Sequence, residues 1–152
     1  MQIEVQRKDA NAAGGDALVI PLTRSDAPPR TLGVLDDAIG GWLARVWSAG
    51  DFSGKSGEVL SFPVAGIASK RVVLIGLGDE KNASAESLRA AAGRAAKALA
   101  RAKAKQASLV VPALRRVKPE EAAQALAEGA LLGAYRFDKY KSDDDRPAAL
   151  ER

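Results

Sequence analysis

The pattern of hydrophobic and polar positions along the chain predicts short buried strands alternating with longer helices. Four consecutive aliphatic residues, Val72–Ile75, follow a charged pair and stop at Gly76, which is typical of a strand buried on both faces. An alanine-rich segment with helical spacing, residues 84–105, comes next, so the local order is strand, glycine turn and helix. Apolar or alternating runs predict further strands over residues 2–6, 16–21, 58–63 and 108–111.

Apolar residues at helical spacing also predict a helix over residues 31–48. Gly40 and Gly41 in its middle each cost about 1 kcal/mol relative to alanine, which weakens the prediction of one continuous helix. Ser84 is a suitable N-cap for the alanine-rich helix.

A last helix is predicted to begin at Pro119, since proline suits the first helical position. Gly129 and Gly133 fall on one side of it and would let it lie close to the sheet or to another helix. The pattern ends at Asp143–Pro147, which is typical of a linker. Strands that alternate with helices in this way predict an α/β domain with parallel crossover connections.

Length and composition are those of a single soluble domain. The chain has 152 residues, of which 47% are hydrophobic and 28% charged. It contains no cysteine, which excludes disulfides and is compatible with a cytoplasmic location. The segment Met1–Lys8 has no apolar region typical of a signal peptide. Membrane association is not expected either, because every apolar run falls well short of the roughly 20 residues that span a bilayer.

The basic residues are concentrated in one part of the chain. Residues 87–119 hold nine lysines and arginines and no acidic residue, whereas the whole chain carries a net charge of +4. The favoured interpretation is the solvated face of a surface helix. The alternative is a nucleic-acid-binding face formed by Arg94, Lys97, Arg101 and Lys105. No aromatic residue interrupts this segment, so such binding would use phosphate contacts alone.

Gly76 and Gly78 are the candidate ligand-binding residues, because open α/β sheets bind ligands at the carboxyl ends of their strands. A dinucleotide fingerprint would need a third glycine where Lys81 stands, so glycines that turn a strand into a helix are favoured. Phosphate binding by their backbone amides remains an alternative. The run Gly54–Ser56 departs from a phosphate-binding P-loop in spacing and context, which favours a polar turn.

No catalytic apparatus is visible in the sequence. Histidine and cysteine are both absent, which excludes His-containing triads, cysteine nucleophiles and the commonest zinc sites. The adjacent carboxylates Asp36–Asp37 and Asp143–Asp145 are interpreted as solvated charges, since neighbours on a helix do not face one another.

Three segments resemble the amino-terminal domain of the cytosol (leucyl) aminopeptidase family: residues 49–58, residues 70–78 with the helix that follows, and above all residues 128–142. The resemblance extends in the family's order from residue 1 to about 145. It implies a three-layer α/β domain with a mixed sheet flanked by helices, akin to macro domains. By analogy with macro domains, the resemblance also suggests that an ADP-ribose-type ligand binds at Gly76 and Gly78.

The resemblance further implies that the parent protein is a cytoplasmic, hexameric di-metal exopeptidase. Such enzymes remove amino-terminal residues, often leucine, with zinc or manganese held in a carboxyl-terminal catalytic domain. That domain's Asn-Thr-Asp-Ala-Glu-Gly-Arg signature is absent here, so no catalytic or metal-binding residue of the family can be placed on this sequence. We therefore expect no cofactor in this chain and no enzymatic activity of its own.

The expected organisation is an amino-terminal domain over residues 1–142 followed by the start of an interdomain linker over residues 143–152. The chain is expected to be either this isolated domain or a naturally short protein; the linker favours the first. Its expected partners are its own catalytic domain, further copies in a hexamer, and DNA in the alternative interpretation.

Overall fold

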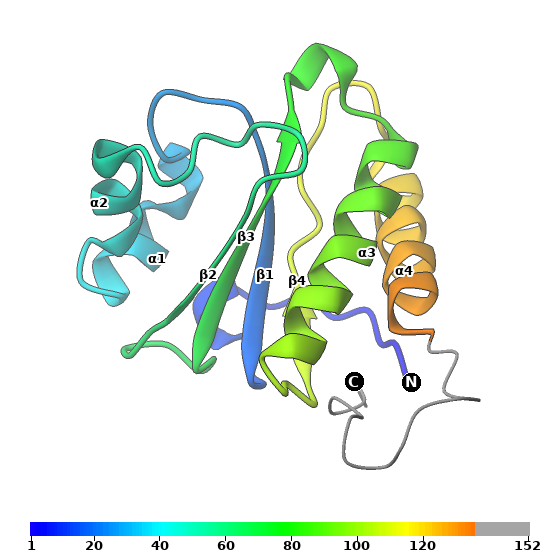
Figure 1. Cartoon of the computed structure of the whole chain (residues 1–152), viewed down its shortest axis with the longest axis horizontal. Coiled ribbons are helices and arrows are strands. Elements are labelled where there is room, and N and C mark those ends of the chain that lie inside the picture. Colours follow the sequence, from blue (N-terminus) through cyan, green and yellow to red (C-terminus); the bar gives the residue numbers. More distant parts are fainter. Residues whose placement is uncertain (136–152) are drawn as a thin grey trace.

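A computed structural model describes residues 1–135, and the linker predicted over 143–152 lies outside the described residues. One four-stranded sheet stands between two pairs of helices (Figure 1). The strands, in the spatial order β2-β3-β1-β4, are β1 (Ala17–Thr23), β2 (Val59–Pro63), β3 (Arg71–Gly78) and β4 (Ala107–Leu109). The helices are α1 (Gly33–Ala38), α2 (Trp42–Ala49), α3 (Ala85–Arg101) and α4 (Pro119–Ala134). Short 3-10 turns lie at Ala10–Ala12, Arg30–Leu32 and Glu80–Asn82.

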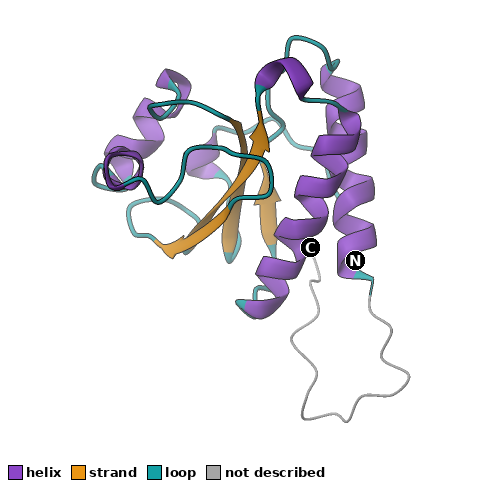
Figure 2. Ribbon diagram, turned by 45° about the horizontal axis from the view of Figure 1, so that its top comes forward, coloured by secondary structure: helices purple, strands orange, loops and turns teal. Residues whose placement is uncertain are grey.

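The sheet is mixed, as the resemblance implied. β1 pairs in parallel with β3 and with β4, whereas β2 runs antiparallel to β3. Both central strands are buried along nearly their whole length, because helices cover both faces of the sheet. The three-layer α/β prediction is therefore confirmed (Figure 2).

Two hydrophobic clusters fill the two spaces between the layers. Successive residues of a strand point to opposite faces of the sheet and so belong to different clusters: Val73 and Ile75 face α3 and α4, whereas Val72 and Leu74 face α1 and α2. The α3/α4 side is built largely from alanines, while the other side holds larger side chains such as Phe52.

The helix predicted over residues 31–48 is broken into α1 and α2. Gly40 and Gly41 both adopt φ of +75°, a left-handed conformation that ends one helix and begins another in a new direction. The Asp36 carboxylate then accepts hydrogen bonds from the amides of Leu43 and Ala44 at 2.7 and 3.2 Å. Asp36 therefore caps α2, and its interpretation as a merely solvated charge was wrong.

The strand predicted over residues 2–6 is absent from the described structure. Ile3 and Val5 are 43% and 80% exposed, and the segment pairs with none of the four strands. Alternating polarity alone does not make a strand, because the ladder hydrogen bonds require a partner with a free edge.

The two long helices begin as expected. The Ser84 and Ser87 side chains each accept a hydrogen bond from the other's backbone amide, which forms a capping box at the start of α3. Pro119 occupies the first turn of α4. α3 ends at Arg101, four residues before the predicted end, because Lys103 adopts φ of +55° and turns the chain toward β4. No helix within residues 1–135 is long and apolar enough to cross a membrane.

Candidate functional site

The ligand site expected for this fold lies where β1 and β3 end side by side. After β1 the chain passes to α1 and α2 on one face of the sheet, and after β3 it passes to α3 on the other (Figure 1). Adjacent parallel strands whose connections leave in opposite directions define the crevice in which open α/β sheets bind ligands. Gly76 and Gly78 lie at this crevice, where the sequence predicted them.

In this protein the crevice is filled by the loop of residues 53–58, which we call the crevice loop. A Cβ added at Gly76 would overlap the carbonyl oxygen of Lys55, and one added at Gly54 would overlap the carbonyl of Thr23. The loop backbone therefore rests directly on the ends of both central strands, and only glycine fits at these two contact points.

Hydrogen bonds join the crevice loop to the end of β3. The amides of Gly76 and Gly78 donate to the carbonyls of Glu58 and Gly54 at 2.8 and 2.9 Å, and the Gly57 amide donates to the Gly76 carbonyl at 3.2 Å. Phosphate binding by the amides of Gly76 and Gly78 is thus incompatible with this arrangement. Binding of an ADP-ribose-type ligand stays a prediction and would have to use other groups.

The crevice loop also holds an anion of its own, the Glu58 carboxylate. One of its oxygens accepts hydrogen bonds from the amides of Ser53 and Lys55 at 3.1 and 2.8 Å. Burial works to raise the pKa of this carboxyl, but hydrogen bonds from the amides of residues 53–55 outweigh it and lower the pKa overall. Successive amides that converge on one point are typical of anion-binding loops, and here the anion is the chain's own side chain.

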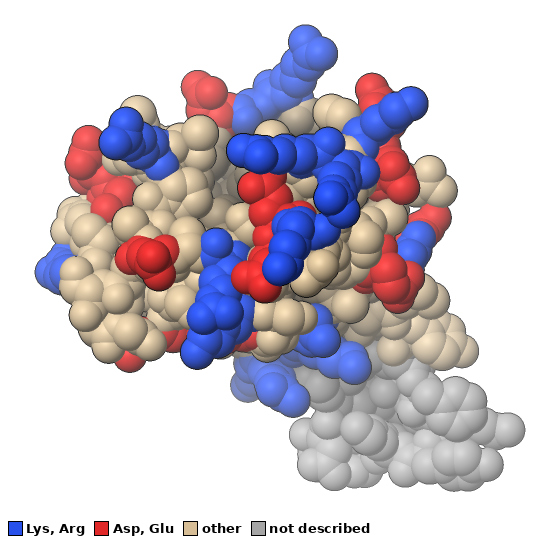
Figure 3. All heavy atoms as spheres, turned by 90° about the horizontal axis from the view of Figure 1, so that it is seen from above, with Lys and Arg blue, Asp and Glu red and all other residues tan. Residues whose placement is uncertain are grey.

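The predicted basic residues are only partly brought together. Arg94, Lys97 and Arg101 lie along α3 with exposed side chains, as expected. Lys105 lies beyond the end of α3, in the turn before β4, so it does not continue their helical row. Seen from the end of the molecule where β1 and β3 finish, acidic side chains lie between basic ones (Figure 3). Charges of both signs are therefore interspersed at that end.

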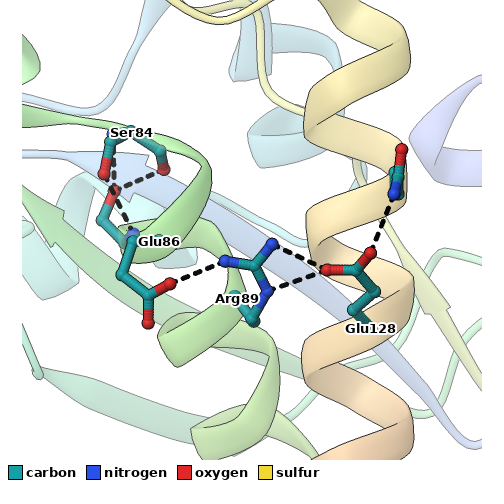
Figure 4. Close-up of polar contacts among 6 residues, drawn as sticks. Ser84, Glu86, Arg89 and Glu128 are labelled. Carbon is teal, nitrogen blue, oxygen red and sulfur yellow. Dashed lines mark hydrogen bonds and ion pairs between the residues drawn. The ribbon is translucent and has the colours of Figure 1, made fainter.

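A charged cluster that joins α3 to α4 was not predicted. The Arg89 guanidinium donates from two nitrogens to one oxygen of Glu128 at 2.7 and 2.8 Å, and from the third to Glu86 at 2.6 Å (Figure 4). The hydrogen bonds to Glu128 and Glu86 raise the pKa of Arg89, while hydrogen bonds from Gln124 and Arg89 lower the pKa of Glu128. The Glu86–Arg89 and Gln124–Glu128 pairs, each three or four residues apart on one helix, could be recognised from sequence, whereas the Arg89–Glu128 pair could not.

The packing of α3 on α4 is close because of glycines. Gly129 lies over the backbone of Arg89, and one turn later Gly133 lies over Gly93, so the two helices run parallel. A Cβ at Gly133 would lie 2.6 Å from the Gly93 carbonyl oxygen. This confirms the prediction that Gly129 and Gly133 let the last helix approach another helix.

The described residues do not form a recognisable metal centre. Within residues 1–135, no three carboxylates gather as a group that could hold a metal ion. The donor set present therefore does not fit the zinc or manganese site that the resemblance implies for the parent protein.

Among residues 1–135, Asp16 is the carboxylate whose pKa is most clearly displaced. It connects the start of β1 to the turn before β4. Its two oxygens accept hydrogen bonds from the amides of Lys105 and Gln106 and from the Lys70 ammonium, at 2.9 to 3.2 Å. The Lys105 amide, then Lys70 and Gln106, lower the pKa of Asp16 to about 2. Its contribution to stability is therefore complete above its ordinary pKa of about 4 and is lost as the pH falls toward 2.

We expect Asp16→Asn to lower the free energy of unfolding at pH 7 by about 1 to 2 kcal/mol. This is less than the full pKa displacement would give, because the side chain is 32% exposed to water. Urea unfolding at several pH values should show the difference from the wild type shrinking between pH 4 and 2. Asp37→Asn removes an exposed carboxylate and is the control; a difference for Asp16→Asn that does not change with pH would contradict the assignment.

The fold is that of a macro-like α/β domain. A solved macrodomain, that of Mycobacterium tuberculosis DarG, superposes with a TM-score of 0.66 over 84% of this chain and 88% of its own. At 9% identity this likeness concerns the fold alone.

The chain belongs to the cytosol aminopeptidase family. The family's N-terminal domain matches residues 19–144. A "Probable cytosol aminopeptidase" of Protochlamydia amoebophila is 34% identical over 140 residues, covering 90% of this chain and 28% of that protein. The chloroplastic leucine aminopeptidase 2 of Arabidopsis thaliana is 36% identical over 146 residues, covering 88% and 25%.

A solved structure of a tomato leucine aminopeptidase variant is similar as well. It superposes with a TM-score of 0.75 at 28% identity, over 91% of this chain and 28% of its own. The chain thus spans little more than a quarter of the length of these relatives.

Proposed function

We propose that this chain is the non-catalytic, amino-terminal domain of a longer di-metal aminopeptidase that removes amino-terminal residues such as leucine. The observation that carries the proposal is the match to the family's N-terminal domain over residues 19–144, in a chain about one quarter as long as its relatives. The domain would pack against the catalytic domain, contribute to a hexamer and shape access to the active site.

The filled crevice supports a scaffold role. The place where a macro-like domain would bind a small ligand is occupied by the chain's own loop, and the Glu58 carboxylate satisfies the amides there. The zinc or manganese of the parent enzyme would be held by the catalytic domain, to which the described residues add no clustered ligands. A cytoplasmic location is supported by the names of the bacterial relatives.

An immunoblot of the source cells with an antibody raised against this chain tests the proposal. The expected band runs at about three to four times the 15.9 kDa of this chain, because the chain covers 28% of a typical relative. A single band near the mass of the chain itself would overturn the proposal.

Nucleic-acid binding is the second candidate function. The observation that favours it is the row of Arg94, Lys97 and Arg101 on α3: among residues 1–135, none of the three has a carboxylate within ion-pair distance. Cations in such a row can contact successive phosphates of a nucleic acid.

If this candidate is right, binding to a duplex DNA should weaken steeply with salt. Each of Arg94→Ala, Lys97→Ala and Arg101→Ala should reduce the slope of log affinity against log salt by about one. Arg30→Ala, which removes an arginine beside α1 on the opposite face of the sheet, should leave the slope unchanged. Undetectable binding at low salt would exclude the candidate.

A further inference from the structure

The last turn of α4 and the groove beside it form an apolar surface that nothing in the described structure covers. Leu132 is 69% exposed and Tyr135 76% exposed, whereas Leu126, less than two turns earlier on the same helix, is 3% exposed. A groove of about 400 Å³ runs between α3 and α4 next to Leu132. We call this surface the α3/α4 groove; it is lined by Ala90, Gly93, Arg94, Lys97, Gly129, Leu132 and Gly133, with Glu86 and Arg89 at one end.

The floor of the α3/α4 groove is made of small residues. At the contact of Gly133 with Gly93, α4 cannot carry a larger side chain, because a Cβ at Gly133 would lie within 2.7 Å of two backbone atoms of Gly93. The bottom of the groove is therefore backbone and methyl groups, against which the apolar ridge of another helix can pack at short distance.

The rim of the groove carries positive charge that the described part of the chain does not neutralise. Arg89, at one end, is bound by two glutamates, and its charge is thereby satisfied. Arg94 and Lys97, further along, form no ion pair within residues 1–135 and are exposed. A complementary occupant would bring apolar side chains for the floor and carboxylates for this rim.

Three kinds of occupant can be compared on these features. A second copy of this face would offer Arg94 and Lys97 only the Glu86 carboxylate, which already binds Arg89. A nucleic acid would satisfy the cations but leave Leu132 and Tyr135 without apolar contacts. The remainder of a longer polypeptide can satisfy both, and in the longer relatives the chain continues beyond the last turn of α4, where Leu132 lines the groove.

We propose that the α3/α4 groove is the docking surface for the catalytic domain, and that it receives an apolar segment of that domain flanked by acidic side chains. The inference rests on the proposed function, because it requires the longer protein. It adds the place of contact and the chemistry of the partner.

Amide hydrogen exchange tests this inference in the 152-residue chain and in the longer gene product. In the longer protein, amides of residues 90–97 and 129–135 should exchange at least about tenfold more slowly than in the chain alone. Leu132→Asp in the longer protein should return them to the rates of the isolated chain. Val34→Asp is the matched control, since Val34 is 73% exposed on α1, and it should change nothing.

The outcomes separate the two proposals. A longer protein in which α3 and α4 exchange as fast as in the isolated chain would overturn the docking surface but leave the proposed function intact. A gene product no longer than this chain would overturn both. Association of the isolated chain into dimers that Leu132→Asp abolishes, or equal protection of the groove by added DNA, would assign it to a different occupant.

Discussion

Replacing Gly129 with valine is expected to cost at least about 3 kcal/mol of unfolding free energy, because α3 and α4 would be forced apart. A Cβ at this position would overlap the Arg89 carbonyl oxygen and approach two further backbone atoms of the same residue. Backbone atoms cannot rotate away as a side chain could, so the whole α3/α4 contact has to open. The Arg89–Glu128 hydrogen bonds, which cross this contact, would be lost together with it.

Thermal unfolding measures this effect, and a loss of 3 kcal/mol corresponds to a drop of about 6 to 12 °C in Tm for a protein of this length. Gly33→Ala is the matched control: Gly33 also lies in a helix, and a Cβ there would meet nothing within 4 Å. The control should leave Tm unchanged or raise it slightly, since alanine favours helices. A Gly129→Val protein with the wild-type Tm would show that α4 does not pack on α3 as described.

Replacing Gly76 with valine is expected to destabilise the protein by a similar amount, because it would disrupt the contact between the crevice loop and the end of β3. The new side chain would overlap the Lys55 carbonyl and push the crevice loop off the end of β3. The hydrogen bonds between the Gly76 backbone and residues 57 and 58 would be broken with it. Valine's preference for strands, within a scale of about 1 kcal/mol, would not offset this loss.

Urea unfolding of Gly76→Val should show a lower free energy of unfolding. Gly14→Ala is the control and should show no such loss, because a Cβ added at Gly14 would meet nothing within 4 Å. Amide exchange at residues 53–58 should rise in the Gly76 variant. If the variant is as stable as the wild type and the crevice loop remains protected, the loop does not rest on β3 and the crevice is not filled from within.

The local signals in the sequence were sufficient for the α/β class, whereas the three-layer arrangement with a mixed sheet was implied by the family resemblance. The unbroken apolar run at Val72–Ile75, the Ser84 cap and Pro119 each have a physical cause within a few residues, and the structure confirms all three. The glycines of the last helix also indicated close approach correctly, although the sequence did not decide between the sheet and another helix.

The features that were missed depend on contacts between distant segments. The strand expected at residues 2–6 needed a partner edge, and the filling of the crevice needed Lys55 to meet Gly76. The Arg89–Glu128 pair joins two helices between which β4 intervenes in the sequence. No local pattern encodes such contacts. The sequence therefore placed Gly76 and Gly78 at the end of a central strand, but it did not predict that the crevice loop packs on them.

The central claim, that this is a non-catalytic domain of a longer aminopeptidase, is tested most directly by hydrolysis of leucine p-nitroanilide with added zinc or manganese. The longer gene product and the 152-residue chain should be purified and assayed side by side. We expect metal-dependent hydrolysis by the longer protein and none by the chain. Metal-dependent hydrolysis by the purified chain, free of host peptidases, would contradict the account.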